Sequence, residues 1–475
     1  MRSCHSIVPP RLTLASLWFT STVLALVAAG CTTENASTDP LSAAARATSH
    51  SSLNDANTIV VASSAELVAA LVPENAGRRI RVRAGDYALS QPLVVPDRVT
   101  LDGDGVMLLD GSQLPTGFAA GTRTTLTMTA NVAGDVLTLG DGATVRGIAI
   151  EDLAGRAGNA IAVISREAGD RLSATIDEVE IINPNGHGVM PSGPVGCGVT
   201  ALTRNPNLGG DPPPHAGAAI SATITHSVIR SLSSGIGCGL FAFNFAPDAT
   251  IAVSLVGNVV GGGIIASGGV SRPDAVHDSR TTIKSQRNLY RDDGADPCVS
   301  QRLGWNLQGG SGTPVPLPLP ETARNALRFV SQDDRLEGFT QAIIATGGRR
   351  FFPSPIAGPT TANNVDLELV GTTVSTPSCG GAAFVADFQL SGAWVADASL
   401  APGNDNTLRV VMRGVTASGV RANFYGDVLA PAGPLPSALQ GSGNRLSIVG
   451  SPQAFMQKNV AIDPAPGVEF FTSNK

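Results

Sequence analysis

Carboxylates and guanidiniums occur together at two places in the second half of the chain. Arg291 precedes Asp292 and Asp293, and Arg335 shortly precedes Glu337. If both segments occupy the same position in neighbouring repeats, Asp293 and Glu337 stack on each other. Stacked carboxylates repel unless one is protonated, pairs with arginine or binds a cation, and oxygen ligands suit Ca²⁺. We treat these five residues as candidate catalytic groups, with calcium at Asp293 and Glu337. The alternative is a solvated turn with local Asp–Arg pairs.

A histidine between two glycines is a further candidate. Gly186-His187-Gly188 resembles the GHG element of polygalacturonases, and this resemblance would imply a role for His187 in hydrolysing pectin. The NTDG and RIK elements of that family are missing, and the adjacent Asp pairs follow the histidine instead of preceding it. The alternative is a histidine in a glycine-rich turn.

His277 stands beside Asp278, with Arg272, Asp274 and Arg280 nearby. A histidine next to a carboxylate can act as a general base. The segment contains a proline and no third catalytic partner is evident, so a plain loop is the alternative.

A few large rings could stack on sugars or could instead fill the core and anchor loops. They are Tyr290, Trp305, Phe351, Phe352, Trp394 and Tyr425.

The sequence lacks the motifs of several common enzyme classes, since it has no zinc-ligand spacing, no phosphate-binding Gly-Lys loop and no GxSxG. Its net charge is −6 and it has no basic stretch. Nucleic-acid binding requires clustered arginine or lysine, so we expect no nucleic-acid partner.

The elements that would position these groups begin near residue 60. Ser63 and Glu66 have the spacing of a capping box, and a short apolar helix follows and ends before Pro73. Arg79-Ile80-Arg81-Val82-Arg83 alternates polar and apolar residues, which predicts a strand. Two more short strands are predicted over 93–95 and 99–101.

A short helix followed by IRVRAGDYALSQPLVVPDRVTLDGDG resembles the N-terminal end of pectin-lyase-like right-handed β-helices, over about residues 59–111. In that family the helix plugs the open end of the solenoid, which otherwise exposes an unpaired edge and an apolar core. The resemblance implies an all-β fold, a right-handed parallel β-helix with an N-terminal capping helix. Pectate lyases hold Ca²⁺ on an acidic ledge and use an arginine as base, so the resemblance implies such roles for the acidic set.

Repeats support the same fold. From residue 174 onward a unit recurs in which an aliphatic residue is followed by a glycine about eleven positions later. This repeated spacing favours a solenoid, whose coils stack about 4.8 Å apart, and not a β-sandwich. We expect long loops on most coils, at 187–218, 266–280, 295–324, 346–362 and 427–443. The units begin at Ile176, Ile224, Ile251, Ile283, Leu327, Val365, Leu408 and Leu446.

Four cysteines follow residue 100, which suggests two disulfides in an oxidising compartment. Cys197 and Cys238 fall on adjacent coils and could pair. Cys298 and Cys379 fall two coils apart, roughly 9.6 Å if stacked, so their pairing requires loops to bring them together.

The first thirty-one residues have the layout of a signal peptide, with Arg2 and Arg11 before an apolar stretch. Ala28-Ala29-Gly30-Cys31 resembles a bacterial lipobox, which implies lipidation of Cys31, although Ala28 replaces the usual leucine. We expect residues 1–31 to be a lipoprotein signal peptide, 32–57 a flexible tether and 58–475 the β-helix. Cleavage near Ala29 without lipidation, or a short membrane anchor, is the alternative.

Two functions remain open. One is a lipid-anchored protein of the outer membrane or cell surface that binds a polysaccharide or envelope component without catalysis, as a monomer. The other is a lyase acting on an acidic polysaccharide. A periplasmic or secreted location is the alternative, and calcium is the only cofactor expected.

Overall fold

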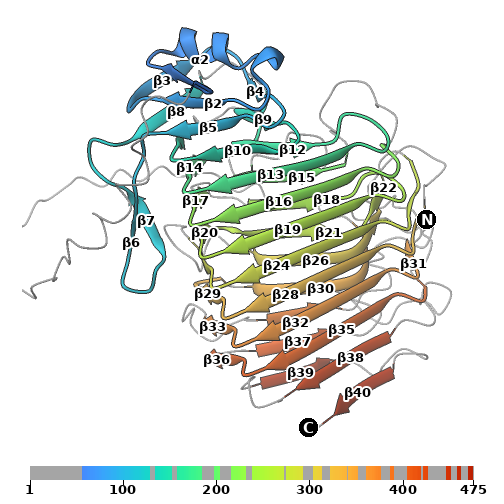
Figure 1. The fold of residues 1–475 in the computed structure, drawn as a ribbon. Coiled ribbons are helices and arrows are strands. Elements are labelled where there is room, and N and C mark those ends of the chain that lie inside the picture. Colours follow the sequence, from blue (N-terminus) through green and yellow to red (C-terminus); the bar gives the residue numbers. More distant parts are fainter. Residues whose placement is uncertain are drawn as a thin grey trace, which may run out of the picture. The chain divides into compact units, whose positions relative to one another are not determined.

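The chain forms a parallel β-helix in which three long sheets stack strand upon strand (Figure 1). The computed structural model describes residues 56–128, 134–151, 158–183, 197–203, 215–231, 238–271, 274–292, 303–312, 321–339, 341–350, 360–375, 386–389, 404–418, 421–425, 445–450, 457–461 and 469–473. Successive strands of each long sheet are parallel, as the predicted solenoid requires.

Sheet A has thirteen strands, and from β13 to β35 each has seven residues. In order they are β1 Thr58–Val61, β2 Arg79–Val82, β5 Thr100–Gly103, β10 Ala143–Arg146, β13 Arg171–Asp177, β16 Ala219–Thr225, β19 Thr250–Val256, β24 Arg280–Gln286, β28 Ala326–Gln332, β32 Asn364–Val370, β35 Thr407–Arg413, β38 Arg445–Gly450 and β40 Glu469–Ser473.

Sheet B has ten strands, and all but the second follow a strand of sheet A after a short turn. They are β3 Gly85–Leu89, β8 Thr124–Met128, β11 Ala149–Glu151, β14 Glu180–Asn183, β17 Val228–Ser231, β20 Val259–Gly261, β25 Leu289–Arg291, β29 Arg335–Glu337, β33 Thr373–Ser375 and β36 Thr416–Ser418.

Sheet C closes the coil. Its strands are β4 Leu93–Val95, β9 Leu137–Leu139, β12 Ile161–Ile164, β15 Val199–Leu202, β18 Cys238–Phe243, β21 Gly263–Ser267, β22 Val270–Ser271, β26 Leu303–Gly312, β30 Gln341–Arg350, β34 Ala386–Gln389, β37 Arg421–Tyr425 and β39 Gln457–Ala461. Two small sheets complete the fold, formed by β23 Val276–His277, β27 Thr322–Ala323 and β31 Thr360–Thr361, and by the hairpin of β6 Met107–Leu109 with β7 Pro115–Phe118.

The N-terminal cap agrees with its predicted sequence signature. Helix α2 spans Ser64–Ala70, the Ser63 hydroxyl accepts from the Glu66 amide, and the Glu66 carboxylate accepts from the Ala62 amide. Leu67 is fully buried in the main core. The helix therefore covers apolar residues of the first coils. A short 3-10 turn, η2 Pro73–Asn75, follows it.

Strand register agrees with the sequence phase for most repeats. Ile176 pairs with Ile224, and Leu327, Val365, Leu408 and Leu446 form one column.

The predicted alignment of neighbouring repeats was wrong at two units. Ile251 pairs with Ile220, four residues before Ile224, and Ile283 pairs with Phe329, two residues after Leu327. Since side chains alternate between faces with a period of two, even slips preserve the inward and outward pattern. The apolar pattern alone therefore could not detect them.

Four of the five expected loops contain strands of sheet C, since β15 lies within 187–218, β22 within 266–280 and β26 within 295–324, and β30 extends into 346–362. Residues 303–312 form β26 and residues 341–350 form β30. Glycines interrupt these segments, which hides their strand pattern in the sequence. Gly304 and Gly309 lie against the carbonyl oxygens of Ala342 and Gly347 on the next strand, so a side chain would collide with backbone there.

The predicted disulfide between Cys197 and Cys238 is present, with a Cα–Cα distance of 4.9 Å. Both cysteines belong to a second apolar cluster that includes Phe241, Phe243 and Ile265. Cys298 and Cys379 lie outside the described residues.

Buried amides fix both ends of the sheet A strands. At their starts, Asn363 accepts from the backbone and side-chain amides of Asn325, and Asn406 does the same for Asn363. At their ends, Asn288 receives the corresponding pair of hydrogen bonds from Asn258. Each ladder satisfies buried donors from one coil to the next, so the spacing of neighbouring strands is fixed at both ends.

Within the described residues, no helix is both long enough and apolar enough to cross a bilayer.

Candidate functional site

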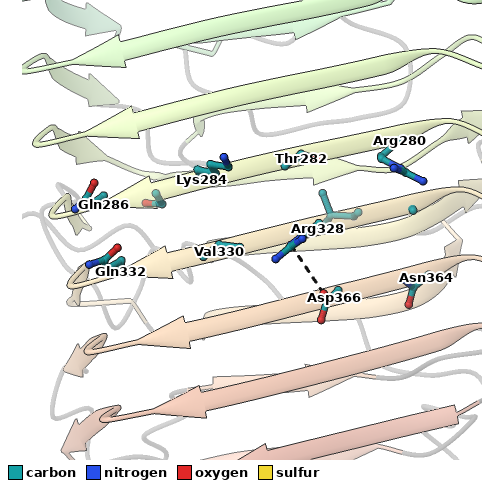
Figure 2. Close-up of a pocket in the computed structure, with 12 residues that line it drawn as sticks. Arg280, Thr282, Lys284, Gln286, Arg328, Val330, Gln332, Asn364 and Asp366 are labelled. Atoms are coloured by element: carbon teal, nitrogen blue, oxygen red, sulfur yellow. Dashed lines mark ion pairs between the residues drawn. The ribbon is translucent and has the colours of Figure 1, made fainter.

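A groove of about 560 Å³ lies on the outer face of sheet A, over strands β24, β28 and β32 (Figure 2). The strands alternate strictly, so apolar residues such as Ile283 and Phe329 point into the core while every second residue faces outward. The outward residues that line the groove are Arg280, Thr282, Lys284, Gln286, Ala326, Arg328, Val330, Gln332, Asn364 and Asp366.

The groove is basic although the protein is acidic overall. Its lining contains three cations, Arg280, Lys284 and Arg328, and one carboxylate, Asp366, while the net charge of the chain is −6. A local concentration of one sign of charge attracts ligands of the other sign whatever the net charge.

Two of the three cations have no acidic partner in the part of the chain that the structure describes. Within the described residues, Arg280 and Lys284 form no ion pair, whereas the ion pairs on this part of the sheet involve Arg328, Arg409 and Arg413. Arg280 and Lys284 are exposed. Their donors are therefore available to a ligand in the groove.

Arg328 is held less freely. Figure 2 shows it directed at Asp366 on the next strand, with a separation of 4.0 Å between Nε and Oδ2. A second carboxylate, Glu368, lies 3.9 Å away. Both separations exceed a hydrogen bond, for which 2.7–3.2 Å is typical.

Uncharged polar side chains complete the surface. Gln286 and Gln332 lie at one end of the strands, and Asn364 lies with Arg280 at the other (Figure 2). A side-chain amide both donates and accepts hydrogen bonds. The groove therefore combines charge for an anion with groups suited to hydroxyls.

The predicted acidic set lies on a different face of the same coils. Arg291 ends β25 in sheet B and pairs in register with Glu337 on β29, while the Asp292 amide donates to the Glu337 carbonyl. Arg335 pairs with Leu289. Glu337 thus stands opposite an arginine, two positions from the alignment that the sequence phase gave. This is the same slip of two seen at Ile283.

Asp293 lies outside the described residues, so calcium at Asp293 and Glu337 stays a prediction. His187 lies outside them as well.

Asp334, next to the predicted set, is a buried structural group. It is fully buried, and its carboxylate accepts from the backbone and side-chain amides of Asn288 and from the Ser331 hydroxyl. Burial raises its pKa, although these hydrogen bonds oppose the shift. It continues the Asn258–Asn288 ladder and does not reach the surface.

His277 and Asp278 do lie together, His277 at the end of β23 and Asp278 directly after it. His277 Nδ1 is 3.0 Å from Asp278 Oδ2, and with Asp248 they bring three possible ligand atoms within 4.8 Å. However, Arg324 donates two hydrogen bonds to Asp278, of 2.9 and 2.6 Å, and these lower the pKa of that carboxyl. Arg280 points to the groove instead. Arg272 lies outside the described residues.

The two aromatic candidates whose side chains are described belong to the core. Trp305 is fully buried and packs on Tyr290, edge to face at 5.3 Å between ring centroids, and on Phe329 at 4.6 Å. They therefore offer no surface to a sugar. Phe351, Phe352 and Trp394 lie outside the described residues, and only the backbone of Tyr425 is described, in β37.

The groove residues were missed in the sequence, except Arg280, which was grouped with His277. A signal was present, because Lys284 is one of only three lysines and six of the seven residues of 280–286 are polar. The register that places Arg328 opposite Thr282, diagonally from Lys284, was not available from the pattern.

No protein-family model matches the chain, and no curated protein matches its sequence. Among solved structures, it resembles one described as a mannuronic acid specific polysaccharide family 6 lyase enzyme from human gut microbiota. The two share 11% sequence identity, with 88% of this chain and 91% of that chain covered and a TM-score of 0.23. At that score the likeness carries no argument about activity.

Proposed function

We propose that the outer face of sheet A binds a short segment of an acidic polysaccharide without cleaving it. The observation that carries this proposal is the exposed pair Arg280 and Lys284, which have no acidic partner in the described residues and line one groove. A guanidinium can bind a carboxylate through two parallel hydrogen bonds, and an ammonium acts as a point charge. The amides beside them suit sugar hydroxyls.

The groove's chemistry does not favour hydrolysis. A glycosidase normally needs two carboxylates flanking the scissile bond. The lining offers one, Asp366, and Arg409 is 2.7 Å from its Oδ1.

A second candidate function is β-elimination. It is favoured by the amine of Lys284, which lines the same groove as the guanidiniums of Arg280 and Arg328. Lys284 would take the proton from C5 of a uronate whose carboxylate is neutralised by arginine. A C4=C5 double bond then forms, the C4–O bond breaks, and the leaving oxygen takes a proton from a donor in the groove or from water. This reaction requires no additional reactant.

Calorimetric titration with uronic-acid tri- and tetrasaccharides tests the proposal. The matched control ligands are the same oligosaccharides with their carboxylates reduced to alcohols. Acidic ligands should bind, more weakly as salt rises, and reduced ones should not. Equal affinity for both forms, or no binding of any acidic oligosaccharide, would overturn the proposal. Rising ultraviolet absorbance from unsaturated product would instead establish the lyase.

The proposed location rests on the sequence alone. Residues 1–31 would direct export, Cys31 would carry lipid, and the outer membrane or cell surface would hold the protein. There the groove would face envelope polysaccharide or polysaccharide from outside the cell.

A further inference from the structure

We infer that Arg328 is a movable third cation of the groove, and that Arg409 and Arg413, which do not line it, position Arg328 for the ligand. This inference rests on the proposed function, since the ligand is the acidic oligosaccharide proposed above. It concerns how the free protein keeps Arg328 available.

The geometry divides each carboxylate between two arginines. Asp366 Oδ1 is 2.7 Å from Arg409, while its Oδ2 faces Arg328 at 4.0 Å. Glu368 Oε1 is 3.1 Å from Arg413, while its Oε2 faces Arg328 at 3.9 Å. In both cases the strong contact is made by the arginine outside the groove. Arg328 therefore has two weak partners and no strong one.

Strand register makes this arrangement a property of the fold. Arg328, Asp366 and Arg409 form one column across β28, β32 and β35. Arg413 lies on the same outward face of β35, at the far end from Thr407. The two outer arginines thus compete with Arg328 for both carboxylates.

Release of Arg328 should cost little. Its side chain is 58% exposed, and ion pairs at such sites contribute little because water and salt screen them. When an anionic sugar enters, Arg328 can turn from Asp366 towards the sugar carboxylate. Asp366 and Glu368 stay neutralised by Arg409 and Arg413, so no unpaired carboxylate is left facing the ligand.

Without the outer arginines the competition disappears. In an Arg409→Gln variant, Asp366 has only Arg328 as a cationic partner among the described residues, so it should draw Arg328 closer. Affinity for an acidic trisaccharide should then fall about two- to fivefold, the range expected for one exposed ion pair. Arg409→Lys should restore most of it.

A double-mutant cycle separates this effect from simple loss of charge. Arg409→Gln should have no further effect in an Arg328→Gln background. The control is Arg445→Gln, which removes an exposed arginine from the adjacent strand β38 and should leave affinity unchanged. Arg413→Gln provides an independent second cycle.

The probe is a uronic-acid trisaccharide, measured by calorimetry on the full mature chain. If the wild type binds it but the effects of Arg328→Gln and Arg409→Gln simply add, the inference is wrong and the proposed function stands. If Arg445→Gln weakens binding as much as Arg409→Gln, the inference is wrong as well. If the wild type binds no acidic trisaccharide, the proposed function itself fails.

Discussion

Arg280 and Lys284 lie four residues apart on β24, so both side chains leave the same face of sheet A beside one groove. Residues separated by an even number share a face of a strand. Thr281 and Ile283, the residues that alternate with them, are buried, and this fixes the orientation. A repeat built for packing therefore also presents two cations on one face, with Thr282 between them (Figure 2).

The buried carboxyl of Asp334 should make stability depend on pH. Because burial raises its pKa in the folded protein, folding favours the protonated form. That contribution is complete below the ordinary value of 3.8 and is lost as pH rises through the raised value. The unfolding temperature of an Asp334→Asn variant should therefore fall less than that of the wild type between acidic and neutral pH. At neutral pH the variant should have the higher unfolding temperature.

The matched control is Asp333→Asn, because Asp333 is adjacent and exposed, and asparagine tolerates its φ of 55°. Its pH profile should follow the wild type. An Asp334→Asn profile parallel to the wild-type profile would contradict the prediction.

Removing one ladder amide should destabilise the coils beneath the groove. Asn363→Ala deletes the acceptor of two Asn325 hydrogen bonds and leaves buried donors unsatisfied, which costs roughly 2–4 kcal/mol. Asn364→Ala removes the same side chain from the next, exposed position and should cost under about 1 kcal/mol. Denaturant unfolding compares the two, and equal losses would show that the ladder adds nothing special.

The disulfide should stabilise the coils that it joins. It closes a loop with a sequence separation of 41, for which the chain-entropy argument gives roughly 4 kcal/mol. A Cys197→Ala/Cys238→Ala variant should unfold at a clearly lower temperature than the wild type. Reductant should lower the wild-type value towards that of the variant, and an unchanged midpoint in the variant would contradict the argument.

Lipidation is predicted at one cysteine of the leader. Cys31→Ser should abolish incorporation of labelled fatty acid in a bacterial host that exports the protein. Cys4→Ser, a matched change in the same segment, should leave incorporation intact. Loss of label with both variants, or with neither, would contradict a lipobox at Cys31.

The fold could be read from the sequence because solenoid packing repeats one local rule. Ser63 and Glu66 indicated the cap, and the columns through Ile176 and Leu327 were predicted correctly. Strand pairing at Ile251 and Ile283 could not be, since an even slip leaves the same residues buried. Strands β26 and β30 resembled loops in the sequence because glycines interrupt their alternation of side chains.

The candidate site was harder to predict because it depends on register. Glu337 was aligned with Asp293, although the strands place it opposite Arg291. Arg328 and Lys284 are far apart in the chain, and only the pairing of β24 with β28 places Arg328 opposite Thr282, diagonally from Lys284. The residue types alone pointed to the carboxylates that lie beside sheet B. The pairing of strands in sheet A is what brings the cations of the groove onto one face.

The central claim is that Arg280 and Lys284 bind an acidic sugar, and one comparison tests it most directly. The Arg280→Gln/Lys284→Gln variant is titrated with a uronic-acid tetrasaccharide beside Arg171→Gln, which changes the exposed arginine in the same column as Arg280, three strands away. Because charged hydrogen bonds are lost, the affinity of the double variant for the tetrasaccharide should be lower by about tenfold or more. The affinity of Arg171→Gln should be close to that of the wild type. Wild-type affinity in the double variant, or an equal loss in Arg171→Gln, would contradict the account.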